Sequence, residues 1–399
     1  MSREFVCIST QPIYAKLGRL SLPWGITEHM ALGNCEDVAS DSFSDTASII
    51  STSPSTVDHS TTSSARPLTR GVYVPTICFF DPVTEDLDLT TLAQHVAQLA
   101  TSGVAGIAVQ GSNGEAVHLT AAERRTVTRT ARTALASAGF PAMPIIAGCG
   151  AQSTRETIEL CRDAANSGAD YALILPPTYY RGLHAQNTLR DYFVAVADAS
   201  PIPLIIYNYP AGAGGVDLDS DTIVELAHYP NIVGVKLTCG NTGKMARIVA
   251  ATRSLRKINN QAKPELALEE SLTPETLANS AETPAFLVLA GSADFTVQSL
   301  SVGAHGILGG LANISPKACM QIQKLHVAGD YAGARAVQEV VARGDWTAIK
   351  TGVVGVKAGM QAWLGYGGFA RSPLPRPQEK QMAEIKAGFE ELVTLERTL

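Results

Sequence analysis

The run Asn231-Ile232-Val233-Gly234-Val235-Lys236-Leu237-Thr238 decides how the rest of this chain is interpreted. It is short, rich in β-branched residues and apolar without alternation, which is typical of a strand buried on both faces of a parallel sheet. Lys236 stands at its end, where burial of an ammonium group is costly unless a function requires the amine. Lys236 is therefore a candidate nucleophile, although its position alone equally allows a lysine that reaches solvent.

Runs of the same kind recur from Gly71 onward and alternate with longer segments of helical periodicity, which predicts repeated βα units on a parallel sheet. The predicted strands are Gly71–Phe79, Val104–Gln110, Pro144–Ala147, Tyr171–Leu175, Leu204–Asn208, Ile232–Lys236, Phe286–Ala290 and Gly306–Leu308. The predicted helices are Leu87–Ser102, Ala121–Ala138, Thr154–Ser167, Asn187–Ala199, Ser220–His228, Lys244–Arg253 and Thr296–Val302. Eight such strands close a TIM (β/α)8 barrel. An open doubly wound sheet is the alternative, but its glycine-rich dinucleotide loop is missing.

The segments outside the barrel differ from it in composition. Residues 1–68 are rich in Ser, Thr and Asp, and we predict a disordered tail whose first thirty residues faintly resemble a targeting peptide. The barrel spans 69–312 with a polar surface insertion at 256–283. Residues 313–399 predict a helical appendage around Ala318–Val327, Ala332–Ala342, Val353–Trp363 and Met382–Thr398. We expect a cytoplasmic location, with a mitochondrial one as the alternative.

The composition argues against several classes of function. A net charge of -6 and a pI near 5.8 provide no basic surface for nucleic acid or an anionic membrane. No apolar run approaches the roughly 20 residues of a membrane span. The seven cysteines and eight histidines are scattered without the paired spacings of zinc sites. We therefore expect reduced thiols and no metal or cofactor.

Functional groups of a parallel barrel lie where the strands end, and four predicted strand ends carry suitable residues. Besides Lys236, Tyr207 ends the preceding strand, where a phenol could transfer protons. Gly111-Ser112-Asn113-Gly114-Glu115 follows strand two and could direct backbone N–H groups at an anion, although the same residues form ordinary turns. The aromatic residues of Pro176–Gly182 could line a site or a subunit contact.

Together these residues resemble the dihydrodipicolinate synthase/N-acetylneuraminate lyase family of imine-forming aldolases, and among its members 4-hydroxy-2-oxoglutarate aldolase. The resemblance extends from about Gly71 to Pro375 and leaves out the insertion. The motifs that carry it are Gly111–Glu115, Tyr179–Gly182, Ser200–Pro203, Tyr207–Pro210, Pro230–Gly234 leading to Lys236, Leu289–Ala293, Trp363–Gly368 and Arg371–Leu374.

The resemblance implies a role for each matching residue. Lys236 would attack the 2-oxo carbon of the substrate, and Tyr207 would shuttle protons. Ser112 would link Tyr207 to Tyr180, which in the family reaches the site of a neighbouring subunit. The substrate would be held by Ser112, Asn113, Gly114 and Gly291. These roles imply a cofactor-free aldolase that releases pyruvate from a 4-hydroxy-2-oxo acid such as 4-hydroxy-2-oxoglutarate or a 2-keto-3-deoxy sugar acid, and a homotetramer built of dimers.

Two residues depart from the family pattern. Members that condense pyruvate with aspartate semialdehyde carry an arginine where this chain has Gly212, so the bidentate clamp for a second carboxylate is missing. Leu237 stands where an acidic residue is frequent. Dihydrodipicolinate synthesis and a non-catalytic scaffold remain the alternative hypotheses. A second Val-Gly-Val-Lys at Val354–Lys357 is predicted to lie on an appendage helix, so Lys357 is not a candidate nucleophile.

Overall fold

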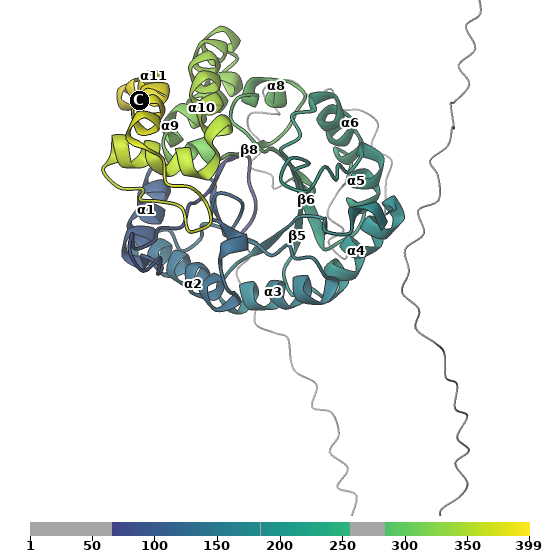
Figure 1. Cartoon of the computed structure of the whole chain (residues 1–399). Helices are drawn as coiled ribbons and strands as arrows, with labels where there is room; N and C mark the ends of the chain where they lie inside the picture. Colours follow the sequence, from purple (N-terminus) through teal and green to yellow (C-terminus); the bar gives the residue numbers. More distant parts are fainter. Residues whose placement is uncertain (1–65, 184, 256–283) are drawn as a thin grey trace, which may run out of the picture. The chain divides into compact units, whose positions relative to one another are not determined.

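The computed structural model describes residues 66–183, 185–255 and 284–399. Within them, parallel strands close a barrel in chain order, and β1 pairs with β8 (Figure 1). The strands are β1 (Gly71–Pro75), β2 (Gly106–Val109), β3 (Ile145–Gly148), β4 (Tyr171–Ile174), β5 (Leu204–Asn208), β6 (Ile232–Leu237), β7 (Leu287–Ala290) and β8 (Gly306–Leu308). The predicted barrel is confirmed.

The strands are mostly apolar because both of their faces are covered. All residues of β2, β3 and β4 are buried between the side chains that fill the barrel and the helices that surround it. The barrel closes between Gly71 and Gly306, which are partners in the β1–β8 pairing. A Cβ atom on Gly306 would collide with the carbonyl oxygen of Gly71, so only glycine allows the two strands to approach this closely.

Helices follow the strands and form the outer ring seen in Figure 1. They are α1 (Leu89–Thr101), α2 (Ala121–Ser137), α3 (Thr154–Asn166), α4 (Gln186–Ala199), α5 (Ser220–Leu226), α6 (Thr242–Thr252) and α8 (Thr296–Ser301). Short 3-10 helices in the described ranges are η1 (Ala116–His118), η2 (Arg181–Leu183) and η3 (Gly310–Asn313). A capping box begins α2, where the Thr120 and Glu123 side chains accept hydrogen bonds from each other's backbone N–H groups.

The C-terminal appendage consists of α9 (Pro316–Val327), α10 (Tyr331–Leu364) and α11 (Glu379–Thr398), which lie together beside α1 and α8 in Figure 1. The helical periodicity predicted two separate helices where α10 stands. Gly352 interrupts α10 with φ 60° and ψ -155°, a conformation that glycine accommodates readily. The second predicted helix therefore begins at Val353 as expected, whereas the first continues to Thr351 instead of ending at Ala342.

The predicted tail and insertion lie almost entirely outside the described residues. Arg66 to Leu68, the last residues of the predicted tail, belong to the barrel. Arg66 forms an ion pair with Asp170, and Leu68 is buried in the cluster that fills the barrel interior. Among the described helices, none is both long and apolar enough to cross a membrane.

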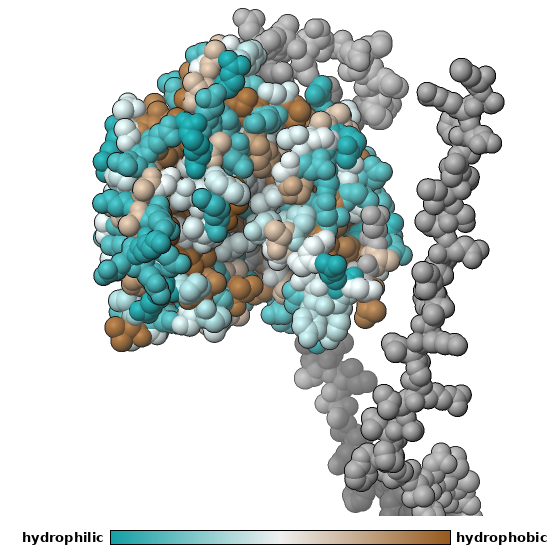
Figure 2. Space-filling model, turned by 45° about the horizontal axis from the view of Figure 1, so that its top comes forward, coloured by the Kyte–Doolittle hydropathy of each residue, from teal (hydrophilic) through white to brown (hydrophobic). Residues whose placement is uncertain are grey.

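The face of the molecule drawn in Figure 2 is mainly hydrophilic. Figure 2 shows hydrophilic side chains over much of one face, with scattered hydrophobic ones and a hollow near its centre. Exposed apolar side chains include Val83, Val117, Tyr179 and Leu183. Exposure of Val83 and Val117 as single side chains is normal for a globular protein, whereas Tyr179 and Leu183 lie close in the sequence to the exposed Tyr180.

Candidate active site

The ends of β5 and β6 bring Tyr207 and Lys236 together. The two residues are partners in the β5–β6 pairing, and the Nζ atom of Lys236 lies 4.1 Å from the centroid of the Tyr207 ring. Both residues are nearly inaccessible to solvent: Lys236 is 3% exposed and Tyr207 is 4% exposed. Among the described residues Lys236 has no hydrogen bond or ion pair, so a buried amine faces an aromatic ring instead of a carboxylate.

The hydroxyl of Ser112 contacts the hydroxyl of Tyr207. The Ser112 Oγ atom is 3.4 Å from the Tyr207 hydroxyl, a long hydrogen bond in which either group could donate. Ser112 belongs to the turn that connects β2 to η1, and Gly114 allows this turn to pack tightly. A Cβ atom on Gly114 would lie 2.9 Å from the backbone nitrogen of Gln110. The structure thus places Lys236, Tyr207 and Ser112 at one end of the barrel.

The other predicted binding residues border the same end of the barrel. The Asn113 side chain lies against Gly310, where a Cβ atom would approach its Nδ2 atom to 2.7 Å. Gly291 follows β7 and lies against Thr238, because a Cβ atom there would collide with the Thr238 hydroxyl. The predicted loops after β2 and β7 therefore face the loops after β8 and β6, respectively.

Thr238 is a candidate that the sequence prediction missed. It follows Lys236 by two residues, the spacing that places side chains on the same face of a strand. Its Oγ1 atom is buried and has no hydrogen-bond partner among the described residues. The two-residue spacing could have identified Thr238 from the sequence, since a hydroxyl two residues beyond a reactive lysine lies near the same site.

Tyr180 is not brought together with Ser112 in a single chain. Its surface is 64% exposed, and its ring packs edge-on against Tyr179 with a centroid separation of 5.0 Å and an interplanar angle of 86°. The resemblance assigned this tyrosine to the site of a neighbouring subunit, so its role stays a prediction.

A buried ion pair between Lys357 and Glu115 joins α10 to the turn that carries Ser112. Lys357 lies on α10 as predicted, but its amine is fully buried and lies 2.6 Å from Glu115 Oε1 and 2.9 Å from the carbonyl of Phe369. The backbone N–H of Arg371 donates to Glu115 Oε2 at 2.9 Å. Burial lowers the pKa of Lys357, while the Glu115 carboxylate opposes that shift. The helical appendage is thereby joined to the turn that carries Ser112.

Asp345, also on α10, holds the loop after β7. Its Oδ2 atom accepts hydrogen bonds from Ser292 Oγ at 2.6 Å and from the backbone N–H groups of Ala293 and Asp294 at 2.7 and 3.0 Å. Complete burial raises the pKa of Asp345 to about 6, against the opposing effect of these donors. One helix of the appendage therefore anchors two of the loops around Lys236.

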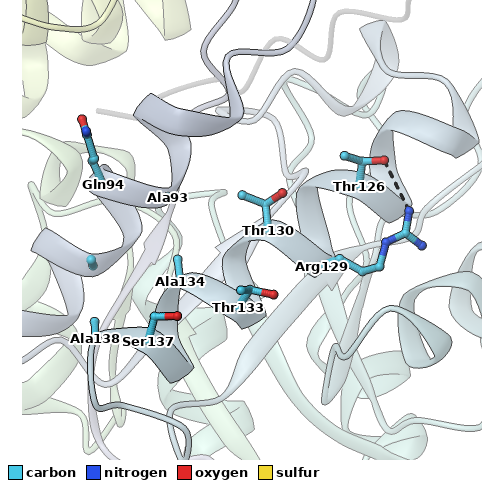
Figure 3. Close-up of a pocket in the computed structure, with 10 residues that line it drawn as sticks. Ala93, Gln94, Thr126, Arg129, Thr130, Thr133, Ala134, Ser137 and Ala138 are labelled. Atoms are coloured by element: carbon cyan, nitrogen blue, oxygen red, sulfur yellow. Dashed lines mark hydrogen bonds between the residues drawn. The ribbon is translucent and has the colours of Figure 1, made fainter.

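A groove on the outer wall lies away from these residues. It runs between α1 and α2, and its lining includes Ala93, Ala97, Thr130 and Thr133 (Figure 3). None of the predicted active-site residues lines this groove. Because the functional groups of such barrels lie at the carboxyl ends of the strands, the groove is not the candidate active site. Among the described residues, no group of three His, Cys, Asp or Glu side chains could hold a metal ion.

Comparison with known proteins now decides the family. The model of the Dihydrodipicolinate synthetase family matches residues 69–260 and 272–392. The chain belongs to this family. Residues 261–271, which lie between the two matched stretches, fall within the predicted insertion at 256–283. The predicted family resemblance is confirmed.

Two curated relatives match nearly over their whole length. One, from Emericella nidulans, is named "Probable 4-hydroxy-2-oxoglutarate aldolase, mitochondrial"; it is 49% identical and covers 84% of this chain and 98% of its own length. The other, an L-threo-3-deoxy-hexylosonate aldolase from Aspergillus niger, is 45% identical with the same coverage of both chains. A solved structure of a dihydrodipicolinate synthase family protein from Coccidioides immitis superimposes with a TM-score of 0.69 at 32% identity, covering 84% of this chain and 99% of its own.

Proposed function

We propose that this protein is a lysine-dependent aldolase that cleaves a 4-hydroxy-2-oxo acid to pyruvate and an aldehyde. The observation that carries the proposal is the Lys236 amine, buried at the end of β6, 4.1 Å from the Tyr207 ring centroid and without a carboxylate partner among the described residues. A lysine that only stabilised the fold would be expected to pair with an acid, as Lys357 does. The names of the two curated aldolases agree with this reaction class.

The chemistry follows from the arrangement. The unprotonated Lys236 amine attacks the C2 carbonyl, and loss of water produces a protonated imine that accepts electrons. Tyr207 gives its proton to the departing water, and the resulting phenolate removes the proton of the C4 hydroxyl and later returns it to C3. The C3–C4 bond breaks, and an aldehyde leaves while the electron pair forms an enamine. Protonation of the enamine at C3 and addition of water to the imine release pyruvate and restore the amine.

The Ser112 turn completes the proposed site. Ser112 donates a hydrogen bond to the Tyr207 oxygen across their 3.4 Å contact and so stabilises the phenolate, and the backbone around Asn113 and Gly114 binds the C1 carboxylate. In an oligomer, Tyr180 of a neighbouring subunit would extend this relay, consistent with its exposure in the single chain. We propose a homotetramer on this basis, which measurement of the mass in solution tests.

Trapping the imine tests the mechanism directly. Borohydride added with pyruvate is expected to attach a three-carbon acid to Lys236, seen by mass spectrometry of the digested protein. The variant Lys236→Arg should show no adduct and no aldolase activity. Lys350→Arg, a change at an exposed lysine of α10, is the matched control and should behave like the unaltered protein. An active enzyme with an unmodified Lys236 would exclude the mechanism.

A dihydrodipicolinate synthase is the second candidate, since relatives with the name 4-hydroxy-tetrahydrodipicolinate synthase share 32% and 30% identity. Gly212 argues against it because no arginine stands there to bind a second carboxylate. Assays of pyruvate with glyoxylate, both glyceraldehydes and aspartate semialdehyde separate the two functions. Turnover of aspartate semialdehyde alone would support the synthase, and turnover of none would support the non-catalytic scaffold.

The cellular location is part of the same proposal. Two relatives carry the word mitochondrial in their names, which favours the mitochondrial alternative over the cytoplasm. Residues 1–65, where a targeting peptide would lie, are outside the described residues. Imaging the full chain fused at its C-terminus to a fluorescent protein tests the assignment, and a diffuse signal would contradict it.

A further inference from the structure

Tyr209 lies in the mouth of the barrel, one step further out than Tyr207. The two rings are stacked, with centroids 5.7 Å apart and planes inclined by 13°. Tyr209 also packs against the residues that fill the barrel interior. Two residues of extended chain advance about 6–7 Å, so the substrate atoms beyond C4 would lie beside Tyr209 if C4 lies at Tyr207.

Gly212 is the residue that makes room for this ring. A Cβ atom on Gly212 would lie 2.4 Å from both Cδ1 and Cε1 of Tyr209, closer than atoms can approach. The backbone N–H of Gly212 also donates to the Tyr209 carbonyl at 3.1 Å, which keeps the two residues in one tight turn. Tyr209 and Gly212 therefore form one structural unit, in which any larger residue at position 212 must displace the aromatic ring.

The cationic side chains around this loop already hold acceptors of the protein. Arg181 donates to the carbonyl of Gly214, Lys244 donates to Asp217 and to the Leu218 carbonyl, and Arg247 donates to the Ser220 hydroxyl. By contrast, the Tyr209 hydroxyl has no hydrogen-bond partner among the described residues. Partial burial raises the pKa of Tyr209, so its phenol is a neutral donor near neutral pH.

We propose that the Tyr209–Gly212 unit selects substrates whose tail beyond C4 is uncharged and hydroxylated, the 2-keto-3-deoxy sugar acids, over the dicarboxylate 4-hydroxy-2-oxoglutarate. The phenol binds a tail hydroxyl, and the ring supplies an apolar face for the carbon chain. A second carboxylate would meet this neutral group in place of an arginine fork, and its desolvation would be poorly compensated. The assignment of a substrate class rests on the aldolase function proposed above.

The test measures the ratio of kcat/KM for glyceraldehyde to that for glyoxylate, each condensed with pyruvate. The unaltered protein should favour glyceraldehyde. Tyr209→Phe keeps the ring but removes the hydroxyl, and this ratio should fall about two- to tenfold, the value of one neutral hydrogen bond. Tyr331→Phe, at an exposed tyrosine of α10, is the matched control and should leave the ratio unchanged.

A double-mutant cycle tests the coupling between the two residues. Gly212→Ala should lower the same ratio because its methyl group displaces the Tyr209 ring. In a Tyr209→Val background, where no ring remains to be displaced, Gly212→Ala should have almost no further effect. Additive effects of the two changes would overturn the proposed unit.

Different results would contradict the proposed substrate class and the proposed aldolase reaction. A preference of the unaltered protein for glyoxylate, or a ratio that Tyr209→Phe leaves unchanged, would overturn the selection by Tyr209 even if borohydride still traps pyruvate on Lys236. Absence of that adduct would instead overturn the aldolase mechanism itself. Near-ultraviolet circular dichroism of each variant confirms that the measured ratio comes from folded protein.

Discussion

The buried pair between Glu115 and Lys357 predicts a large effect of a small change. Glu115→Gln alters one atom type and almost no volume, but it leaves the Lys357 ammonium without its counter-charge. The two side chains are 1% and 0% exposed, so water cannot replace the lost carboxylate. Breaking a buried ion pair from one side costs about 3–5 kcal/mol. The Phe369 carbonyl and the Phe80 ring still contact the Lys357 amine, which places the expected loss near the lower value, about 3 kcal/mol.

Urea unfolding, followed by fluorescence, measures this loss against a matched exposed pair. Arg343 and Glu391 join α10 to α11 and are 58% and 55% exposed, so Glu391→Gln should cost less than about 1 kcal/mol. Glu115→Gln should also raise the KM for pyruvate more than it lowers kcat, because Glu115 ends the turn that carries Ser112. The combined variant Glu115→Gln/Lys357→Met should recover most of the stability, since it removes both buried charges.

Equal losses from Glu115→Gln and Glu391→Gln would refute the argument from burial. A normal KM for pyruvate in a destabilised Glu115→Gln variant would show that the pair stabilises the fold without positioning the Ser112 turn.

Three further changes test the rest of the site. Because burial raises the pKa of Asp345 from 3.8 to about 6, the folded protein holds a proton that the unfolded chain releases, and the free energy of unfolding should fall by about 3 kcal/mol as the pH rises from about 3 to about 7. Asp345→Asn should remove this component of the fall, and parallel stability curves for the two proteins would contradict it. Tyr207→Phe should lower kcat by at least about 100-fold with little change in KM, as steady-state assays of the cleavage would show; nearly full activity would exclude Tyr207 as the proton carrier. Gly291→Ala should lower the melting temperature, since its methyl group collides with Thr238, whereas Gly182→Ala, at a site with open space and no positive φ, is the matched control and should change it little.

The family resemblance and the local patterns together predicted most of the fold. Buried strands appear as unbroken apolar runs and the helices that cover them as runs of period 3.6, so the strand order needed no tertiary information. The short strand β1 ends at Pro75, four residues before the predicted end, because apolar residues of the following loop also lie in the core. Leu68, the last residue of the predicted tail, is likewise buried in the barrel interior without belonging to a strand.

Neighbouring strand ends explain why the sequence alone paired Lys236 with Tyr207. In a parallel barrel, consecutive strands lie side by side and end at the same rim, so two residues that each end a strand must meet there. The contacts that hold the loops at this end of the barrel are visible only in the tertiary structure. Lys357 is 242 residues from Glu115, and Asp345 lies 51 to 53 residues beyond the loop it anchors. No local period encodes such contacts, because they depend on how α10 folds back across the barrel. The close contact between Tyr209 and Gly212 is likewise a property of the folded turn. The sequence shows that the two residues are three positions apart, but it does not show that the Tyr209 ring occupies the space where a side chain at position 212 would lie.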